Sequence, residues 1–339
     1  MKKLISLLLV LCLCFSLLAA CGAETPAATT AATSPATTAA PTETTAAAPT
    51  TPQSSIDALN GKKILFVGNS YTQNAHAVMD KGYALTQEER DEDNGLFYHL
   101  CKQKGIEVSI TNWCFGGHNL VETFADVCPK STPCGGTSHP AYLVDRYFDY
   151  VCLQGYMEPE FKGDLNAYLQ PIMDLFREAN PNVKFLILVP HMAVERETLW
   201  STALNELTDP NILICNWGGM LHDIVTKKVS VPGAQQSYYR PTFVISLNEE
   251  DGHHQNMLAG YLTALMVYCT ITGESAEGQP YEFCDDTTLN PYFDLDAHLT
   301  QSYVYEPYTN FVDVFRSQAD MLGLQQLTDQ YIAAFNGGN

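Results

Sequence analysis

KILFVGNSYT, at residues 63–72, is the stretch of sequence that decides the fold. Its first half is an apolar run closed by Gly68, which is the pattern of a parallel β-strand buried on both faces. Short apolar runs of the same kind follow at 108–114, 150–153, 183–189 and 212–216. The sequence therefore predicts five buried strands.

Helical segments separate these apolar runs. Apolar residues recur with helical spacing over 95–104, 120–127, 165–179 and 198–207. Strands that alternate with helices indicate right-handed crossovers that cover both faces of one parallel sheet. We expect a doubly wound, three-layer α/β fold with a five-stranded parallel sheet. Ligands of such sheets bind beyond the carboxyl ends of the strands, so the residues that follow each strand are the candidates for function.

The N-terminus carries the pattern of an export signal. Two lysines precede an apolar run over 4–18, and the run ends in the sequence LAAC at 18–21. A charged start, an apolar core and small residues at a cleavage site are typical of a secretory signal, which is too short to span a membrane. LAAC resembles the bacterial lipobox, although an ordinary signal with an incidental cysteine is the alternative. The resemblance implies a signal peptide at 1–20, a lipidated Cys21, and an exported protein anchored on the outer face of the bacterial cell membrane.

A tether follows the predicted lipid anchor. Residues 22–54 consist mainly of Thr, Ala and Pro and contain no Lys, no Arg and no aromatic residue. Such a segment buries too little apolar surface to offset its conformational entropy, and at about 3.1 Å per residue it extends over ~100 Å. We therefore expect a tether at 21–54. Since no second linker-like stretch appears, 55–339 is predicted to be one globular domain.

The charge of the chain bears on its partners. Asp and Glu number 38 against 18 Lys and Arg, which gives a net charge of −20. An excess of negative charge argues against nucleic acids and polyanionic substrates. We expect contact with the membrane through the lipid anchor alone.

The cysteines beyond Cys21 can form disulfides in an exported protein, but their connectivity cannot be deduced from sequence. Cys128 and Cys134 bracket a loop and are the candidate pair. Cys152 and Cys215 lie within apolar strand-like runs, where buried free thiols are an equal alternative. A zinc site from Cys128, Cys134 and His139 fits no standard ligand spacing, so we expect no metal.

Residues that can do chemistry follow the first three strands. A serine at a strand-to-helix turn, as at Ser70, can expose its hydroxyl as a nucleophile. Gly117, after the second strand, lets a backbone N–H approach a ligand. Gln154, at the end of the third strand, can donate from its amide into the same cleft. The plain alternatives are an N-cap at Ser70, a turn at Gly117 and a helix cap at Gln154.

The sequence EDGHH at 250–254 precedes an apolar helix predicted over 257–271. An acid three residues before a histidine, both opening a helix, lets the carboxylate orient and stabilise the imidazolium. Two registers have this spacing, namely Glu250 with His253 and Asp251 with His254. An acidic first turn that complements the helix dipole is the alternative, and a metal site lacks further ligands nearby.

In chain order these four stretches resemble the sequence blocks of the SGNH/GDSL hydrolase family, over about 62–273. The matching residues are Gly68-Asn69-Ser70, Gly117, Gln154 and Asp251-Gly252-His253-His254. Asn69 stands where the family usually has Asp, and Gln154 stands where it usually has Asn. Leu-Gln at this strand end is similar to one branch of the family. In the family a glycine commonly stands five residues after the catalytic histidine. Gly260 lies nearer to this position when the count starts from His254 than when it starts from His253, which favours the Asp251/His254 register.

The resemblance implies an SGNH/flavodoxin-like fold and a serine esterase that uses no metal or organic cofactor. Ser70 would be the nucleophile, His254 the general base, and Asp251 the residue that orients the imidazole. The oxyanion hole would comprise the N–H groups of Ser70 and Gly117 and the amide of Gln154. The implied reaction is hydrolysis of carboxylic esters through an acyl-enzyme, acting on a small-molecule or glycan ester. Family analogy favours deacetylation of carbohydrate, with lipid or lysophospholipid esters as the alternative substrates.

Other interpretations stay open. A non-catalytic lipoprotein that binds a glycan or solute on the same scaffold is the alternative function, because a fold does not dictate an activity. Residues 230–246 have no counterpart in the family and form either a flap or a packed surface excursion. Trp113, Tyr156 and Trp217 fall near strand ends and either stack on sugar rings or belong to the core.

Overall fold

The computed structural model of the chain describes residues 55–73, 95–114, 120–124, 146–155, 164–190, 203–239, 243–245, 254–255, 257–285, 314 and 317–337. These residues belong to one compact unit, Thr51–Asn339. The predicted signal peptide, Cys21 and the tether lie outside the described residues, so they stay predictions. None of the helices in the ranges above is both long and apolar enough to cross a bilayer.

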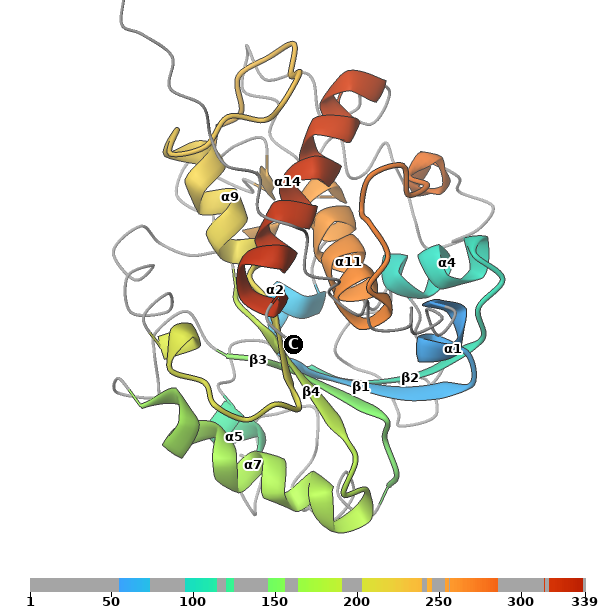
Figure 1. Cartoon of the computed structure of the whole chain (residues 1–339), viewed down its shortest axis with the longest axis vertical. Coiled ribbons are helices and arrows are strands. Elements are labelled where there is room, and N and C mark those ends of the chain that lie inside the picture. The colour runs from blue at the N-terminus through green and yellow to red at the C-terminus, as the bar shows by residue number, and fades with distance from the viewer. Residues whose placement is uncertain are drawn as a thin grey trace, which may run out of the picture. The chain divides into compact units, whose positions relative to one another are not determined.

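Each of the five predicted apolar runs forms a strand (Figure 1). The strands are β1 (Lys62–Gly68), β2 (Val108–Cys114), β3 (Tyr150–Gln154), β4 (Lys184–Leu188) and β5 (Ile212–Cys215). All pair in parallel, in the order β2-β1-β3-β4-β5. The fold class is therefore α/β with a five-stranded, all-parallel sheet, in the flavodoxin-like strand order.

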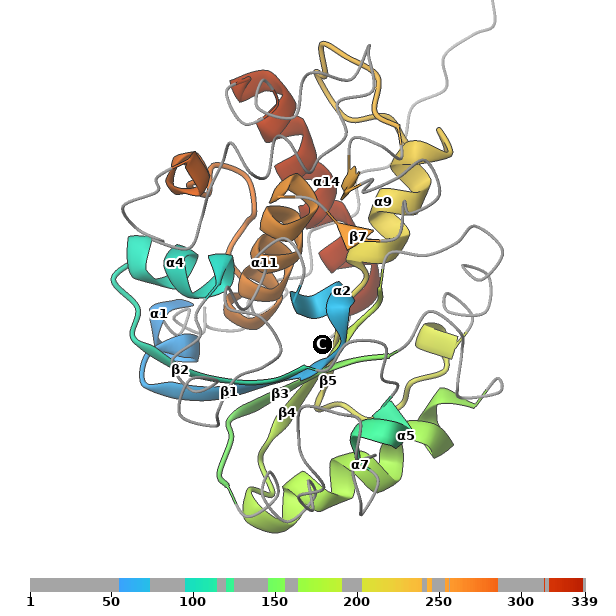
Figure 2. The same cartoon turned by 180° about the vertical axis from the view of Figure 1, so that it is seen from behind.

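Helices cover both faces of this sheet, as predicted (Figures 1 and 2). Side chains alternate along each strand, so Ile64 and Phe66 belong to one hydrophobic cluster whereas Leu65 and Val67 belong to the other. The helices that contribute to the first cluster are α1 (Ser55–Leu59), α4 (Leu96–Gln103), α9 (Trp217–Val225), α11 (Met257–Thr272) and α14 (Gln318–Asn336). Those on the second are α5 (Leu120–Thr123) and α7 (Leu165–Ala179).

The predicted helices largely agree with the structure. α7 has the predicted bounds, and α4 lies within the predicted 95–104. Asp164 begins α7 as its N-cap, since its Oδ1 accepts a hydrogen bond from the N–H of Ala167 at 2.9 Å. Of the helix predicted at 198–207, residues 203–205 are helical and 198–202 lie outside the described residues. The last residues of the helix predicted at 120–127 also lie outside them.

α11 is the central helix of the first cluster. Every residue from 258 to 269 is buried, and α1, α4, α9 and α14 all contact the helix. A helix that is apolar on every side must be enclosed by other elements. The predicted apolar helix is thus confirmed, one residue longer than expected.

α14 has no counterpart among the predicted helices, and it protects the edge of the sheet. It packs on α9 and α11 and ends beside β5, the edge strand. Asn336 Oδ1 accepts a hydrogen bond from the N–H of Ile214 at 2.9 Å, and its Nδ2 donates to the Ile214 carbonyl at 2.8 Å. The Asn336 side chain thereby satisfies polar groups that an edge strand otherwise exposes.

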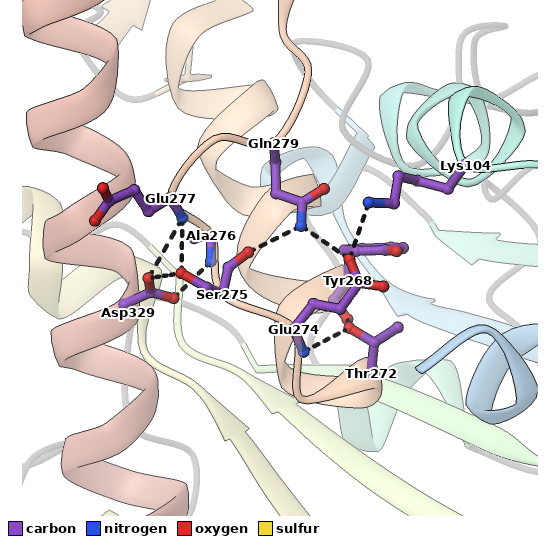
Figure 3. Close-up of polar contacts among 9 residues, drawn as sticks. All are labelled: Lys104, Tyr268, Thr272, Glu274, Ser275, Ala276, Glu277, Gln279 and Asp329. Carbon is purple, nitrogen blue, oxygen red and sulfur yellow. Dashed lines mark hydrogen bonds and ion pairs between the residues drawn. The ribbon is translucent and has the colours of Figure 1, made fainter. Parts of the chain in front are cut away.

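The loop after α11 is held by side chains of α14 and α4 (Figure 3). Asp329 of α14 accepts hydrogen bonds from the hydroxyl of Ser275 at 2.5 Å and from the N–H of Ala276 at 2.6 Å. Lys104, at the end of α4, pairs with Glu274 at 3.1 Å. This end of α11 lies at the amino ends of the strands, because Thr272 and the first residues of β1 and β4 line one surface pocket. The network therefore stabilises the end of the domain opposite the predicted ligand cleft.

The structure decides between a disulfide and a free thiol for Cys152 and Cys215. Cys152 and Cys215 are buried and free, and burial raises the pKa of both thiols. Both belong to a hydrophobic cluster, where Cys215 Sγ donates to the hydroxyl of Thr270 at 3.5 Å, so they contribute as small core residues. The candidate pair Cys128 and Cys134, with His139, lies outside the described residues.

Candidate functional site

The order of the strands places the topological switch point of the sheet between β1 and β3. From β1 the chain passes to β2 on one side of the sheet and later to β3 on the other. A doubly wound sheet binds its ligands at such a switch point, beyond the carboxyl ends of the strands. The pairing of Val67 with Leu153 sets the ends of these two strands side by side, so the residues after Gly68 lie next to Gln154.

A capped turn carries Ser70 out of β1. The helix α2 spans Ser70–Gln73, and Asn69 precedes it with its side chain fully buried. Asn69 Oδ1 accepts a hydrogen bond from the N–H of Tyr71 at 3.0 Å. Asn69 is therefore the residue that caps the helix, and capping does not account for the serine that follows it.

Gln154 reaches from β3 to this turn. Its Oε1 accepts hydrogen bonds from the N–H of Asn69 at 3.2 Å and from the hydroxyl of Thr72 at 2.6 Å. Its Nε2 donates to the carbonyl of Gly155. The side chain is only 2% exposed, so these contacts are shielded from water. Gln154 thus holds the start of α2, the turn that bears Ser70, in agreement with the helix-cap alternative, and its oxyanion role stays a prediction.

Gly68 makes room for this contact. A Cβ at position 68 would lie 2.4 Å from Thr72 Oγ1 and 2.8 Å from Gln154 Oε1, closer than van der Waals contact allows. The packing at position 68 therefore leaves room for glycine only. This explains why the apolar run of β1 ends in a glycine.

A two-stranded ribbon brings the segment of His254 to the same turn (Figure 2). β7 (His254–Gln255) pairs antiparallel with β6 (Val244–Ile245), and β7 contacts both α2 and α11. His254 was expected to open a helix, but it lies in β7, and α11 begins only at Met257. The backbone of His254 is nevertheless adjacent to the helix that begins at Ser70.

β6 belongs to the segment that had no assigned role, residues 230–246. Tyr238 and Phe243 in this segment are 2% and 1% exposed, and their rings stack at 5.7 Å between centroids. Among the described residues, then, the segment is a packed excursion rather than an open flap. Its function in the fold is to supply the strand that pairs with His254.

Several predicted site residues are not decided by the structure. Gly117 and Asp251 lie outside the described residues, and so do the side chains of Ser70 and His254. The hydrogen bond between Ser70 and His254, the choice between the two acid–histidine registers, and the oxyanion role of Gly117 stay predictions. Within the described ranges no three His, Cys, Asp or Glu residues are grouped to hold a metal ion.

The aromatic residues near the strand ends belong to the core where they are described. Trp113 is 6% exposed and Trp217 is 1% exposed, on opposite faces of the sheet. Sugar stacking by these two rings is therefore wrong, and the core interpretation is confirmed. Tyr156 lies outside the described residues.

Comparison with known proteins found only structural neighbours. No family model and no curated protein matches the chain. A DUF4886 family protein from Bacteroides uniformis is 14% identical with a TM-score of 0.40, over 68% of this chain and 96% of its own. A candidate SGNH hydrolase from Slackia heliotrinireducens is 16% identical with a TM-score of 0.36, over 62% of this chain and 100% of its own. A family two carbohydrate esterase from Clostridium thermocellum, in complex with cellohexaose, is 14% identical with a TM-score of 0.34, over 69% of this chain and 66% of its own. The function of this chain has to be argued from its own residues.

Proposed function

We propose that this chain is a serine esterase of SGNH type that hydrolyses carboxylic esters through an acyl-enzyme on Ser70. One observation carries the proposal: the buried amide of Gln154 binds the turn that bears Ser70, at the switch point of the sheet. An oxyanion hole requires donors that are already in place beside the nucleophile before the reaction begins. The proposal is supported by an amide that is held beside this turn and has one N–H of Nε2 beyond the one that the Gly155 carbonyl engages.

The proposed reaction begins with proton transfer from the Ser70 hydroxyl to His254 as the oxygen attacks the ester carbonyl. The carbonyl oxygen becomes an oxyanion, which the N–H groups of Ser70 and Gly117 and the amide of Gln154 stabilise. The alcohol leaves with the proton from His254, and water then attacks the acyl group with the same histidine as base. Asp251 holds the imidazole in its productive tautomer. The contact between β7 and α2 supports the pairing of Ser70 with His254.

Labelling with a serine-directed fluorophosphonate tests this function. The full chain is expected to form one covalent adduct at Ser70, and Ser70→Ala is expected to form none. His254→Ala should abolish the labelling, whereas His253→Ala should retain it, because only one register supplies the base. An unlabelled wild-type protein would refute the esterase and favour a binding lipoprotein. Labelling lost in His253→Ala alone would assign the other register.

We further propose that the substrate is an acetylated carbohydrate. The support is analogy with the SGNH/GDSL family, whose sequence blocks this chain resembles, together with the predicted export of the chain. Acetylated oligosaccharides should therefore be turned over with a higher kcat/KM than long-chain p-nitrophenyl esters or lysophospholipids. Preference for the long acyl chains would instead assign a lipid substrate.

The lipid anchor at Cys21 is a separate proposal, supported by the sequence at 18–21. Cys21→Ala is expected to release the protein from the membrane fraction or leave it unprocessed, while esterase activity per folded molecule is retained. Mass spectrometry of the mature N-terminus measures the lipid directly. Unchanged membrane fractionation of Cys21→Ala and an unmodified N-terminus in the wild type would rule the anchor out.

A further inference from the structure

The amide of Gln154 fits its neighbours in only one orientation. The backbone N–H of Asn69 can only donate, so the atom that faces it at 3.2 Å must be the acceptor Oε1. Nε2 therefore points away from Asn69, toward the carbonyl of Gly155. That carbonyl engages one of the two N–H groups on Nε2. The other N–H is the donor that an oxyanion can use.

Thr72 adds a second contact to the same oxygen. Its hydroxyl lies 2.6 Å from Gln154 Oε1, and because Oε1 is an acceptor, the hydroxyl must donate. Thr72 is 1% exposed, so no water competes for this bond. With Asn69 and Thr72 both donating, both lone pairs of Oε1 are engaged and the amide is held at two points.

The contact depends on features from both sides of the switch point. Gly68 leaves the space that Gln154 and Thr72 share, since a Cβ there would lie within 3.1 Å of the Gln154 Cβ and closer still to both oxygens. Gln154 is one methylene longer than Asn, which lets its amide cross from β3 to the first turn of α2. Among the described side chains of α2, the hydroxyl of Thr72 is thus a group that meets the amide from β3.

We propose that Thr72 is a positioning residue of the esterase, whose hydroxyl orients the Gln154 amide so that Nε2 donates to the oxyanion. The inference rests on the proposed function and adds a residue to it. Thr72 acts through Gln154 and does not touch the substrate. Its contribution should appear only when the oxyanion forms, and therefore in kcat rather than in KM.

Two substitutions test this role. Thr72→Val removes the hydroxyl and keeps the shape, and it is expected to lower kcat about 10- to 100-fold with little change in KM, as for a misplaced catalytic group. Thr72→Ser restores a hydroxyl and should return kcat close to the wild-type value. In a Gln154→Glu background, which already lacks the donor, Thr72→Val should lower kcat no further.

A buried threonine elsewhere provides the matched control. Thr328 of α14 is fully buried, and its hydroxyl donates to the carbonyl of Leu324 at 3.0 Å. Thr328→Val should lower the free energy of unfolding without changing kcat. If Thr328→Val lowers kcat as much as Thr72→Val does, the effect follows stability and the positioning role is refuted.

The outcomes separate this inference from the proposed function. If the wild type labels and turns over esters, but folded Thr72→Val keeps the wild-type kcat, only the role of Thr72 falls. If the wild type neither labels nor hydrolyses any ester, the proposed function falls and takes the inference with it. Should Thr72→Val fail to fold, NMR of the wild type decides. A held amide gives a ¹⁵N relaxation order parameter at Gln154 Nε2 close to that of the rigid backbone, with the signal assigned by its absence in Gln154→Glu, whereas the low value of a freely moving side chain would refute it.

Discussion

Replacing Gln154 with Glu separates the two uses of its amide. A glutamate oxygen can still accept the hydrogen bonds from the N–H of Asn69 at 3.2 Å and the hydroxyl of Thr72 at 2.6 Å. The ionised carboxylate carries no proton that it could donate to an oxyanion, so kcat is measured at a pH above the pKa of this carboxyl group. Gln154→Glu should therefore keep the turn in place and lose the donor.

The expected size of each effect follows from these contacts. Loss of one oxyanion donor lowers kcat by ~10²–10³, which is about 3–4 kcal/mol of transition-state stabilisation. The free energy of unfolding should fall by roughly 3–5 kcal/mol, because the buried carboxylate loses its hydration and faces the carbonyl of Gly155 instead of donating to it. Gln154→Ala is less informative. It leaves two buried donors without partners at about 1–3 kcal/mol each, a large part of a typical stability of roughly 5–15 kcal/mol.

Gln325 on α14 offers a matched control for this substitution. It is as buried as Gln154, accepts a hydrogen bond from Gly278 N–H at 2.9 Å, and donates from Nε2 to the hydroxyl of Tyr261 at 3.0 Å. Its Nε2 also donates to the carbonyl of Gln279 at 2.7 Å, so Gln325→Glu should cost at least as much stability and should leave kcat unchanged. The assay is kcat and KM on p-nitrophenyl acetate, with urea unfolding followed by circular dichroism. Wild-type kcat in folded Gln154→Glu would remove Gln154 from the mechanism. Equal losses of kcat in both variants would show that turnover follows stability alone.

Three further predictions concern packing, the sheet edge and the buried thiols. Gly68→Ala should overpack against the Gln154 amide, which should lower kcat and reduce the free energy of unfolding by about 1–3 kcal/mol. Steady-state kinetics and urea unfolding measure the two effects, and an unchanged kcat would contradict the close approach. Asn336→Ala should cost about 1–2 kcal/mol by unpairing the edge strand and should leave kcat unchanged, as the same two assays would show. Burial raises the pKa of Cys215 from 9.0 to about 12, so the folded state keeps a proton that the unfolded state loses; stability should be full below about pH 9 and fall as pH rises toward 12. Urea midpoints at about pH 8 and about pH 10.5 should fall less in Cys215→Ala than in the wild type, and identical losses would refute this assignment.

The sequence alone determined the five strands of the sheet, α4, α7 and α11, and the candidate residues, because these are encoded locally. Each of the five strands is a continuous apolar run, and a parallel strand buried on both faces needs no other pattern. α11 could be predicted for the same reason, since it is apolar on every side and buried on every side. Ser70 and Gln154 were singled out because ligands of a doubly wound sheet bind beyond the carboxyl ends of the strands, and these two polar residues stand at the ends of β1 and β3.

Only the tertiary structure decided which of these residues meet. The contact of Gln154 with Thr72 joins positions 82 residues apart, and the bonds of Asn336 to Ile214 join positions 122 apart. The pairing of Ile245 with His254 likewise assigns a role to a segment that no local pattern explained. A sequence pattern indicates which side chains are buried and at what spacing buried residues recur along the chain. The partner that buries it depends on strand order and packing across the whole domain, and that information is present only in the folded chain.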